Sequence, residues 1–265
     1  MTQAVVELMV EAAQRLILPR YQTLTSGQVR TKSGPMDLVT VADEEAERWL
    51  TPRLGALLPG SVVVGEEAVA AQPDALQRLL QTAPVWLIDP VDGTWNFAEG
   101  RPDFCVMVAL VQAGVVESGW IYEPLRARCT LAKRGEGAWS LDLTTGKRGE
   151  LSGFAGGRLE ALTGFAYHRP LIGRRVPVRH YRIGSAGVEY VRLVSGQESF
   201  SLYDRNKPWD HAAGSLIATE CGGVAAHVDG TPYRPLPEPR APLLTAPDPQ
   251  TWRQLRDALG LNPGA

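Results

Sequence analysis

Hydrophobic residues in the N-terminal part of the chain follow two different periods. Apolar side chains near helical spacing predict an amphipathic helix over residues 2–18, which ends at Pro19. The stretch 29–41 has strand-like composition and a Ser-Gly-Pro interruption, and together these predict a hairpin. A second amphipathic helix is expected to open at Asp43 and to stop at Pro59-Gly60.

The central part of the chain predicts a sheet. Short apolar runs predict strands at 62–64 and 85–88, with a helical segment at 74–82 between them. Three further apolar runs follow, separated only by a few turn residues, at 104–111, 115–122 and 128–132. Links this short cannot contain crossover helices, so an antiparallel meander is expected.

The last part of the chain alternates strands with helices. Residues 142–160 are rich in glycine and polar side chains, which predicts a loop between two halves, 1–150 and 151–265, of one compact unit. Beyond this loop, strands are expected at 162–167 and 199–203, and helices that end at Val194, Glu220 and Leu259.

Composition and charge limit the classes of protein to consider. The 265 residues suffice for one large or two smaller domains, with 44% hydrophobic and 21% charged residues, as in ordinary globular proteins. A net charge of -2 argues against nucleic-acid binding, and no apolar run approaches the roughly 20 residues that cross a membrane. Without a signal-peptide pattern or a CxxC pair, a cytoplasmic protein is expected.

The run Asp89-Pro90-Val91-Asp92-Gly93-Thr94 follows directly on the apolar stretch 85–88. Two carboxylates therefore come where a buried strand is expected to stop, and a glycine and a hydroxyl follow at once. Carboxylates, a backbone carbonyl and an open turn suit a hard divalent cation such as Mg²⁺. Thr94 would place its hydroxyl beside that cation, so the run predicts metal-assisted transfer of a phosphoryl group to water.

Further acidic residues stand at the ends of predicted elements. Glu66 and Asp89 each follow an apolar strand, so both can project from the same edge of a sheet. Asp43 and Asp210 lie at the starts of helices, where negative charge is favoured and phosphate can bind. A cluster of four or five carboxylates needs compensation, and two or three bound cations would match its charge.

Each of these residues also has an ordinary structural interpretation. Asp43 and Asp210 can be N-caps, Glu66 alone can be solvated surface, and Thr94 can be a turn residue. The DPxDGT run after a buried strand is more specific than these single residues. The chain has no HxxxH pair, no GxxxxGK[ST] loop and no GxSxG, which argues against a histidine metal site, a P-loop and a serine hydrolase.

Four motifs in order resemble those of the inositol monophosphatase family of lithium-sensitive, magnesium-dependent phosphomonoesterases. They are Lys32-Ser33-Gly34-Pro35 with Asp37–Asp43, Gly65-Glu66-Glu67, Trp86–Phe97 and Trp209–Gly214. The resemblance implies an α+β fold, a layered αβαβα sandwich of the inositol monophosphatase and fructose-1,6-bisphosphatase type. It also implies a metal site between the two halves and a homodimer.

The resemblance assigns metal ligands at the matching positions. Glu66, Asp89 and the Val91 carbonyl would hold a first Mg²⁺. Asp89, Asp92 and Asp210 would hold a second ion, and Glu66 a looser third one. Two to three Mg²⁺ ions are therefore the expected cofactor.

The resemblance also assigns roles in catalysis and substrate binding. Glu66 and Thr94 would position and activate the attacking water, and Asp43 would support Thr94 from behind. The backbone N–H groups of Gly93 and Thr94 would bind the phosphate. Lys32 would lie on a hairpin that closes over the site.

The chain departs from the family pattern where substrate is selected. Inositol-specific members carry an acidic residue before the WD motif, and here Asp204 is the candidate for contact with substrate hydroxyls. Arg205 and Lys207 would instead favour a second anionic group. Gly184-Ser185-Ala186 would line the opposite wall of the pocket.

Inositol 1-phosphate is the first candidate substrate on this resemblance. Histidinol phosphate, fructose 1,6-bisphosphate and a 3′-phosphoadenosine nucleotide are the alternatives within the family. A non-catalytic regulatory module is a hypothesis of a different class. The complete set of acidic residues argues against that module.

Overall fold

The computed structural model describes residues 1–34, 37–168, 171, 176–237 and 241–261. In these residues the α-helices are α1 (Thr2–Ala12), α2 (Val41–Leu57), α3 (Glu66–Ala71), α4 (Thr94–Ala98), α5 (Ala186–Val194), α6 (Pro208–Glu220) and α7 (Pro249–Ala258). None of them is both long and apolar enough to span a lipid bilayer.

The strands form a hairpin and two sheets. The hairpin pairs β1 (Val29–Gly34) with β2 (Asp37–Thr40). The larger sheet contains, in spatial order, β3 (Val62–Gly65), β4 (Val85–Asp92), β5 (Cys105–Gln112), β6 (Val115–Glu123), β7 (Arg128–Lys133), β8 (Gly137–Asp142) and β9 (Arg148–Glu150). The smaller sheet has the order β11 (Arg179–Tyr181), β10 (Thr163–Tyr167), β12 (Phe200–Tyr203), β14 (Leu243–Ala246) and β13 (Val224–His227).

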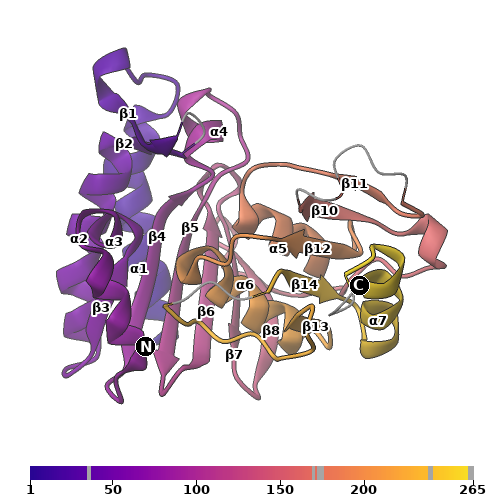
Figure 1. Cartoon of the computed structure of the whole chain (residues 1–265). Coiled ribbons are helices and arrows are strands. Elements are labelled where there is room, and N and C mark those ends of the chain that lie inside the picture. Colours follow the sequence, from indigo (N-terminus) through magenta and orange to yellow (C-terminus); the bar gives the residue numbers. More distant parts are fainter. Residues whose placement is uncertain (35–36, 169–170, 172–175, 238–240, 262–265) are drawn as a thin grey trace.

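Helices and sheets alternate in five layers (Figure 1). Helices α1 and α2 pack on one face of the seven-stranded sheet, and α5 and α6 lie between the two sheets. Helix α7 covers the outer face of the five-stranded sheet. The predicted α+β fold with αβαβα layering is therefore confirmed.

Strand β4 is buried along its whole length because both of its faces are covered. Trp86 and Ile88 pack toward α1 and α2, whereas Val85 and Leu87 pack toward α6. This burial on both faces explains a continuous apolar run in place of an alternating pattern. It also carries Asp89 into the interior.

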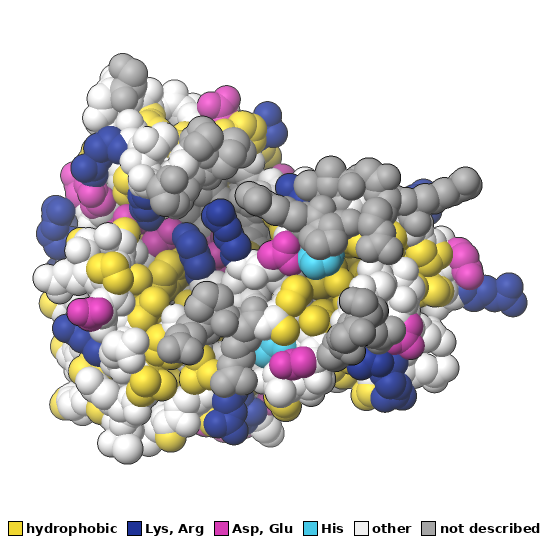
Figure 2. All heavy atoms as spheres, viewed as in Figure 1, with side chains coloured by type: hydrophobic (Ala, Val, Ile, Leu, Met, Phe, Trp, Pro, Cys, Tyr) yellow, Lys and Arg dark blue, Asp and Glu magenta, His cyan; other side chains and the backbone are white. Residues whose placement is uncertain are grey.

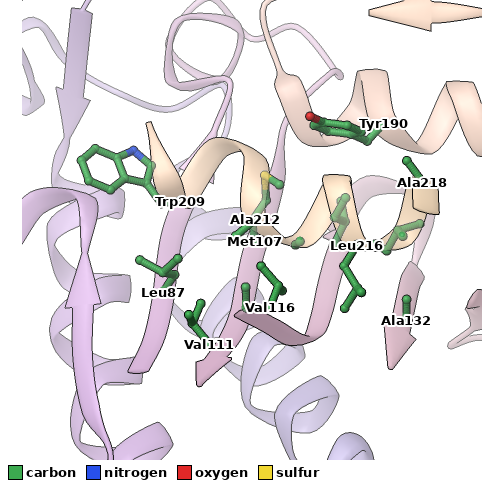
Figure 3. Close-up of a cluster of buried hydrophobic side chains, with 14 of the residues drawn as sticks. Leu87, Met107, Val111, Val116, Ala132, Tyr190, Trp209, Ala212, Leu216 and Ala218 are labelled. Carbon is green, nitrogen blue, oxygen red and sulfur yellow. The ribbon is translucent and has the colours of Figure 1, made fainter. Parts of the chain in front are cut away.

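Helix α6 lies against the seven-stranded sheet through small side chains (Figure 3). A Cβ at Gly119 on β6 would lie 2.7 Å from the Cα of Ala213. A Cβ at Gly214 would lie 2.0 Å from the ring of Tyr190. The small residues of α6 therefore allow close approach to β6 on one side and to α5 on the other.

Several predicted elements have different bounds in the structure. The first helix ends at Ala12 and continues as a π-helix over Ala13–Ile17 and a 3₁₀ turn. The strand expected at 85–88 continues to Asp92, because β5 pairs with it beyond an irregularity. The segment expected to be helical at 74–82 is a 3₁₀ helix over Pro73–Leu80.

The predicted hairpin and meander are confirmed. Val29 pairs with Thr40 in an antiparallel register, although Pro35 of the predicted turn lies outside the described residues. Strands β5, β6 and β7 pair antiparallel. The division at about residue 150 stays a prediction, and α6 of the second half packs on the sheet of the first.

Candidate active site

The end of β4 brings the central motif to the edge of the larger sheet. The regular pairing with β5 is interrupted between Asp89 and Asp92. Within this irregular turn, the Val91 N–H donates a hydrogen bond to Asp89 Oδ1 at 3.1 Å. Gly93 follows with a φ of +89°, a left-handed conformation that glycine adopts without strain, and α4 begins at Thr94.

Glu66, Asp89 and Asp210 meet at this edge. Strands β3 and β4 run parallel with Gly65 opposite Ile88, so the residues that follow them leave the sheet side by side. Asp210 arrives in the first turn of α6, from the other half of the chain. One carboxylate oxygen of each residue lies within 4.8 Å of the others.

Burial and like charge act against ionisation of this group. Burial, followed by the charges of its acidic neighbours, raises the pKa of Asp89 well above its usual value. Burial also raises the pKa of Asp210 to about 8, although the Lys207 ammonium opposes this change. Nearby cations would offset this burial and repulsion and favour the ionised carboxylates.

Two lysines supply part of that positive charge. Lys32 Nζ lies 3.0 Å from Glu66 Oε1 and 2.6 Å from Glu67 Oε1. Lys207 Nζ lies 3.3 Å from the same Glu66 oxygen. Burial alone would lower the pKa of Lys32, but the two glutamates outweigh it and raise this pKa. Figure 2 shows Lys or Arg side chains over acidic ones near the centre of this face.

The donor set fits a hard divalent cation. The three clustered groups all offer carboxylate oxygens, which Mg²⁺ prefers, and a backbone carbonyl at Val91 lies in the same turn. A doubly charged ion would also offset the burial and the like-charge repulsion that together raise the pKa of Asp89. Glu66, Asp89 and Asp210 could therefore hold Mg²⁺.

Thr94 and Asp43 lie together beside this cluster. Thr94 Oγ1 is 3.1 Å from Asp43 Oδ1 and 2.9 Å from the Val91 carbonyl oxygen. The other Asp43 oxygen, Oδ2, accepts hydrogen bonds from the N–H and hydroxyl of Thr40. Burial raises the pKa of Asp43 to about 7, although the Thr40 bonds oppose it.

The sequence predicted that Asp43 would open the second helix, and this prediction is wrong. Helix α2 begins at Val41 with Thr40 as its N-cap, and Asp43 is the reciprocal partner three residues on. Together they form a capping box, in which each side chain bonds the other's backbone. This bond to Thr40 engages one carboxylate oxygen of Asp43, while the other faces Thr94.

Asp92 is bound differently from the three clustered carboxylates. Its Oδ2 accepts hydrogen bonds from Ser185 Oγ at 2.5 Å and from the Gly187 N–H at 2.7 Å. Its Oδ1 accepts one from the Ala186 N–H at 3.1 Å. Burial raises the pKa of Asp92, although these bonds oppose it. Asp92 thus links the end of β4 to the start of α5.

The predicted pocket wall at Gly184-Ser185-Ala186 lies against Gly93. A Cβ at Gly93 would lie 2.9 Å from Ser185 Cβ and 3.3 Å from the Gly184 carbonyl oxygen. Asn96 Nδ2 donates to the Ile183 carbonyl at 3.0 Å and holds the two turns together. Asn96 belongs to the central motif, but its role in holding these two turns together was not predicted from the sequence.

Glu189 supports the same wall from inside the molecule and was also missed. Its carboxylate accepts hydrogen bonds from the Tyr167 and Tyr203 hydroxyls, each at 2.5 Å, and from the Ile183 N–H at 2.9 Å. Burial raises the pKa of Glu189 to about 7 against these bonds. Its position inside α5 carries no motif that could have identified it.

Asp204 follows directly on β12. His168 Nδ1 lies 2.5 Å from Asp204 Oδ1. The next residue, Arg205, offers its carbonyl oxygen to His211 Nε2 at 2.9 Å. Burial lowers the pKa of His211 to about 4, so this histidine is neutral at pH 7 and acts as a buried tether for the segment.

Comparison with known sequences identifies the family. The sequence profile of the inositol monophosphatase family matches residues 1–258. The chain belongs to this family. Dependence on a metal ion is general among these phosphatases, and the acidic cluster described above is present in this member.

Named relatives agree with this assignment. Inositol-1-monophosphatase of Mycobacterium leprae is 36% identical over 211 residues, which are 74% of this chain and 70% of that protein. Inositol-1-monophosphatase of Bacillus subtilis is 29% identical over 231 residues, 84% and 83% of the two chains. A fructose-1,6-bisphosphatase/inositol-1-monophosphatase of Thermotoga maritima is 29% identical over 214 residues, 76% of each chain.

Solved structures share the layered fold of this family member. An IMPase of Thermotoga maritima superposes with a TM-score of 0.77 at 24% identity, and 98% of this chain and 96% of that one are covered. SuhB of Mycobacterium tuberculosis gives a TM-score of 0.72 at 26% identity, with 98% and 95% covered.

Proposed function

We propose that this member is a Mg²⁺-dependent phosphomonoesterase that hydrolyses a small phosphorylated polyol, with inositol 1-phosphate as the first candidate. The observation that supports this most directly is the cluster of Glu66, Asp89 and Asp210 beside the Thr94 hydroxyl. The names of the relatives support the reaction class. At 29–36% identity they leave the substrate to be determined.

The proposed metal ligands are those that the family resemblance implies, and the clustering of Glu66, Asp89 and Asp210 supports them. Glu66, Asp89 and the Val91 carbonyl would hold one Mg²⁺, and Asp89, Asp92 and Asp210 a second, with Glu66 available to a third. Asp92 Oδ2 accepts hydrogen bonds from Ser185, Gly187 and the Cys105 thiol, whereas Oδ1 accepts only the one from the Ala186 N–H and therefore keeps a lone pair for a cation. When bound, the ions would supply a more acidic water and neutralise the transferring phosphoryl group.

Thr94 and Asp43 orient the attacking water in this proposal. The Thr94 hydroxyl has a single hydrogen, which it donates either to Asp43 Oδ1 or to the Val91 carbonyl. Either choice leaves a lone pair on Oγ1 that can accept a hydrogen bond from water. The water is then held with its own lone pair free to attack phosphorus, and Glu66 can accept its second hydrogen.

The backbone at Gly93 and Thr94 would bind the phosphate. Helix α4 begins at Thr94, so the first N–H groups of the helix have no partner within it. The left-handed turn at Gly93 allows the chain to enter the helix directly after the acidic segment. These N–H groups would bind phosphate oxygens next to the cations.

The substrate wall favours a neutral polyol over a bisphosphate. Lys207 Nζ contacts Glu66, so one member of the basic pair proposed for a second phosphate faces the acidic cluster. Asp204, with Gly184-Ser185-Ala186 on the opposite wall, would accept hydrogen bonds from substrate hydroxyls. His168 would hold the Asp204 carboxylate in place.

The test is phosphate release from a small panel of compounds, first with Mg²⁺ and then with EDTA. The panel contains inositol 1-phosphate, histidinol phosphate, fructose 1,6-bisphosphate and 3′-phosphoadenosine 5′-phosphate. Mg²⁺-dependent release from inositol 1-phosphate well above the others supports the proposal. Preference for another compound would show that inositol 1-phosphate is not the preferred substrate. No phosphate release from any of the compounds would favour the non-catalytic regulatory module.

Three properties are proposed from the family alone: a homodimer, inhibition by Li⁺ and a cytoplasmic location. Sedimentation velocity on the purified chain tests the dimer. Li⁺ titration in the same phosphate assay tests inhibition. Fractionation of the source cells tests the location.

A further inference from the structure

Glu47 is a buried carboxylate that no motif includes. It lies in the second turn of α2 and is 5% exposed. Its Oε2 accepts a hydrogen bond from the Glu67 N–H and its Oε1 one from the Ala68 N–H, both at 2.8 Å. Both donors belong to the first turn of α3, which has no side-chain cap of its own from Gly65. The two helices are thus joined by a two-pronged contact.

The contact also explains the glycine of the Gly65-Glu66-Glu67 motif. Gly65 has a φ of -107°, which any residue adopts, so its backbone conformation does not require glycine. A Cβ at this position would lie 2.1 Å from the Glu47 carboxyl carbon. Glycine is therefore needed to leave space for the Glu47 carboxylate beneath the start of α3.

We propose that Glu47 is a positioning residue that fixes the direction of the Glu66 carboxylate toward the metal cluster. Glu66 is the first residue of α3, and the next two N–H groups of that turn are held by Glu47. Rotation of the turn would move Glu66 relative to Asp89 and Asp210. This inference rests on the proposed function, because it assigns Glu47 an effect on Mg²⁺ affinity.

The expected effect of losing this contact is on metal binding. Residues that orient metal ligands typically change affinity 10- to 100-fold when they are replaced. Glu47→Gln keeps the size of the side chain but turns one acceptor into a donor that faces a backbone N–H. We expect Glu47→Gln to weaken Mg²⁺ binding by about 10-fold or more, measured by calorimetric titration of EDTA-treated protein.

A second variant reaches the same contact from the other side. Gly65→Ala places its methyl group where the Glu47 carboxylate now lies, and the end of that flexible side chain must move away. It should therefore weaken Mg²⁺ binding as Glu47→Gln does. In a Glu47→Ala background the space is vacant, so adding Gly65→Ala should have little further effect on the affinity.

A readout that needs no metal follows the backbone directly. Amide hydrogen exchange, measured in EDTA, should accelerate in Glu47→Gln at one or both of Glu67 and Ala68, because glutamine keeps only one of the two acceptor oxygens that these N–H groups use. Glu123→Gln is the matched control. Glu123 is 2% exposed, and its partners are Arg126 and Arg128 and not the start of α3. Its loss should leave Mg²⁺ affinity within about twofold of wild type.

The outcomes separate this inference from the proposed function. If wild-type protein hydrolyses its substrate with Mg²⁺ but Glu47→Gln binds Mg²⁺ as tightly as wild type, the positioning role is wrong and the function stands. If Gly65→Ala weakens Mg²⁺ binding equally in the wild-type and the Glu47→Ala backgrounds, the positioning role of Glu47 is also wrong. If wild-type protein neither binds Mg²⁺ nor hydrolyses any phosphomonoester, the proposed function fails and the inference fails with it.

Discussion

At the scale of single residues, the site holds carboxylates in surroundings that oppose their charge. Burial of Asp89, followed by the negative charges of Glu66, Asp92 and Asp210, raises its pKa. Such a residue is unfavourable for folding unless a cation binds, because each like charge repels it at short range. Its presence therefore indicates a function that stability alone does not explain.

Replacing Asp89 separates its effect on activity from its effect on stability. Asp89→Asn removes a charge that would bridge two cations, so turnover with Mg²⁺ should be abolished. In EDTA the same change relieves repulsion, and the melting temperature should stay equal to that of wild type or rise. Steady-state kinetics measures the turnover, and thermal unfolding measures the melting temperature. An unchanged kcat would contradict the assignment of Asp89 as a ligand.

Thr94 offers a test of water orientation. Thr94→Val keeps the shape of the side chain but loses the oxygen that contacts Asp43 and Val91. We expect kcat to fall by about 100-fold or more, the size typical of a lost proton acceptor, at saturating Mg²⁺. Thr94→Ser keeps the hydroxyl and should retain most of the activity. Equal losses in both variants would argue against the hydroxyl.

At the scale of elements, buried acids join the helices to the strands near the site. Asp92 binds the start of α5, and Glu189 ties α5 to the tyrosines of β10 and β12. Ionisation of Glu189 is unfavourable in the folded protein, since burial raises its pKa from 4.5 to about 7. The substrate wall is thus held by hydrogen bonds to a group that titrates near neutrality.

The raised pKa of Glu189 makes the free energy of unfolding depend on pH. A carboxyl with a folded pKa above its unfolded value favours the folded state below the unfolded pKa, and this contribution is lost as pH rises through the folded pKa. Glu189 should therefore make the free energy of unfolding fall between about pH 4.5 and 7. Urea denaturation in EDTA across this range should show a weaker fall for Glu189→Gln. Parallel curves for the two proteins would contradict the prediction.

At the scale of the whole molecule, α6 connects the two sheets. It carries Asp210 at its first turn and packs on the larger sheet with the small residues that follow (Figure 3). The metal cluster therefore depends on the docking of α6 as well as on the end of β4. The close contact between Gly214 of α6 and Tyr190 of α5 is the point at which the docking of α6 is most easily disturbed.

Gly214→Ala tests the docking of α6. The added methyl would lie 2.0 Å from a buried Tyr190 ring, so the helix must shift. We expect the free energy of unfolding to fall by about 1–3 kcal/mol, the usual range for overpacking, together with weaker Mg²⁺ binding. Gly55→Ala in α2, which meets no atom within 4 Å, is the control and should be neutral or slightly stabilising.

Most of the secondary structure near the site could be predicted from local patterns. The valine-rich strand, the DPxDGT run and the WD helix each combine an apolar period with punctuation by glycine or proline. Strands β11, β13 and β14 were missed because three or four residues carry too little pattern to stand out. Strand β8, which has no continuous apolar run, was missed as well, and the stretch 142–160 that was expected to be a loop contains strand β9. The helix start at Thr40 was missed because Asp43, its capping-box partner, was assigned as the cap.

The sequence alone was enough to predict an acidic metal site that transfers a phosphoryl group to water, because that prediction depends on residue types at short spacings. The layered fold was predicted from the resemblance of four motifs to a known family. The roles of Asn96, Glu47 and Glu189 emerged only from the folded chain. Each acts across 20 or more residues or between separate elements, as when Glu47 Oε2 accepts the Glu67 N–H 20 positions away. Such contacts depend on how helices dock, and no local pattern in the sequence records that geometry.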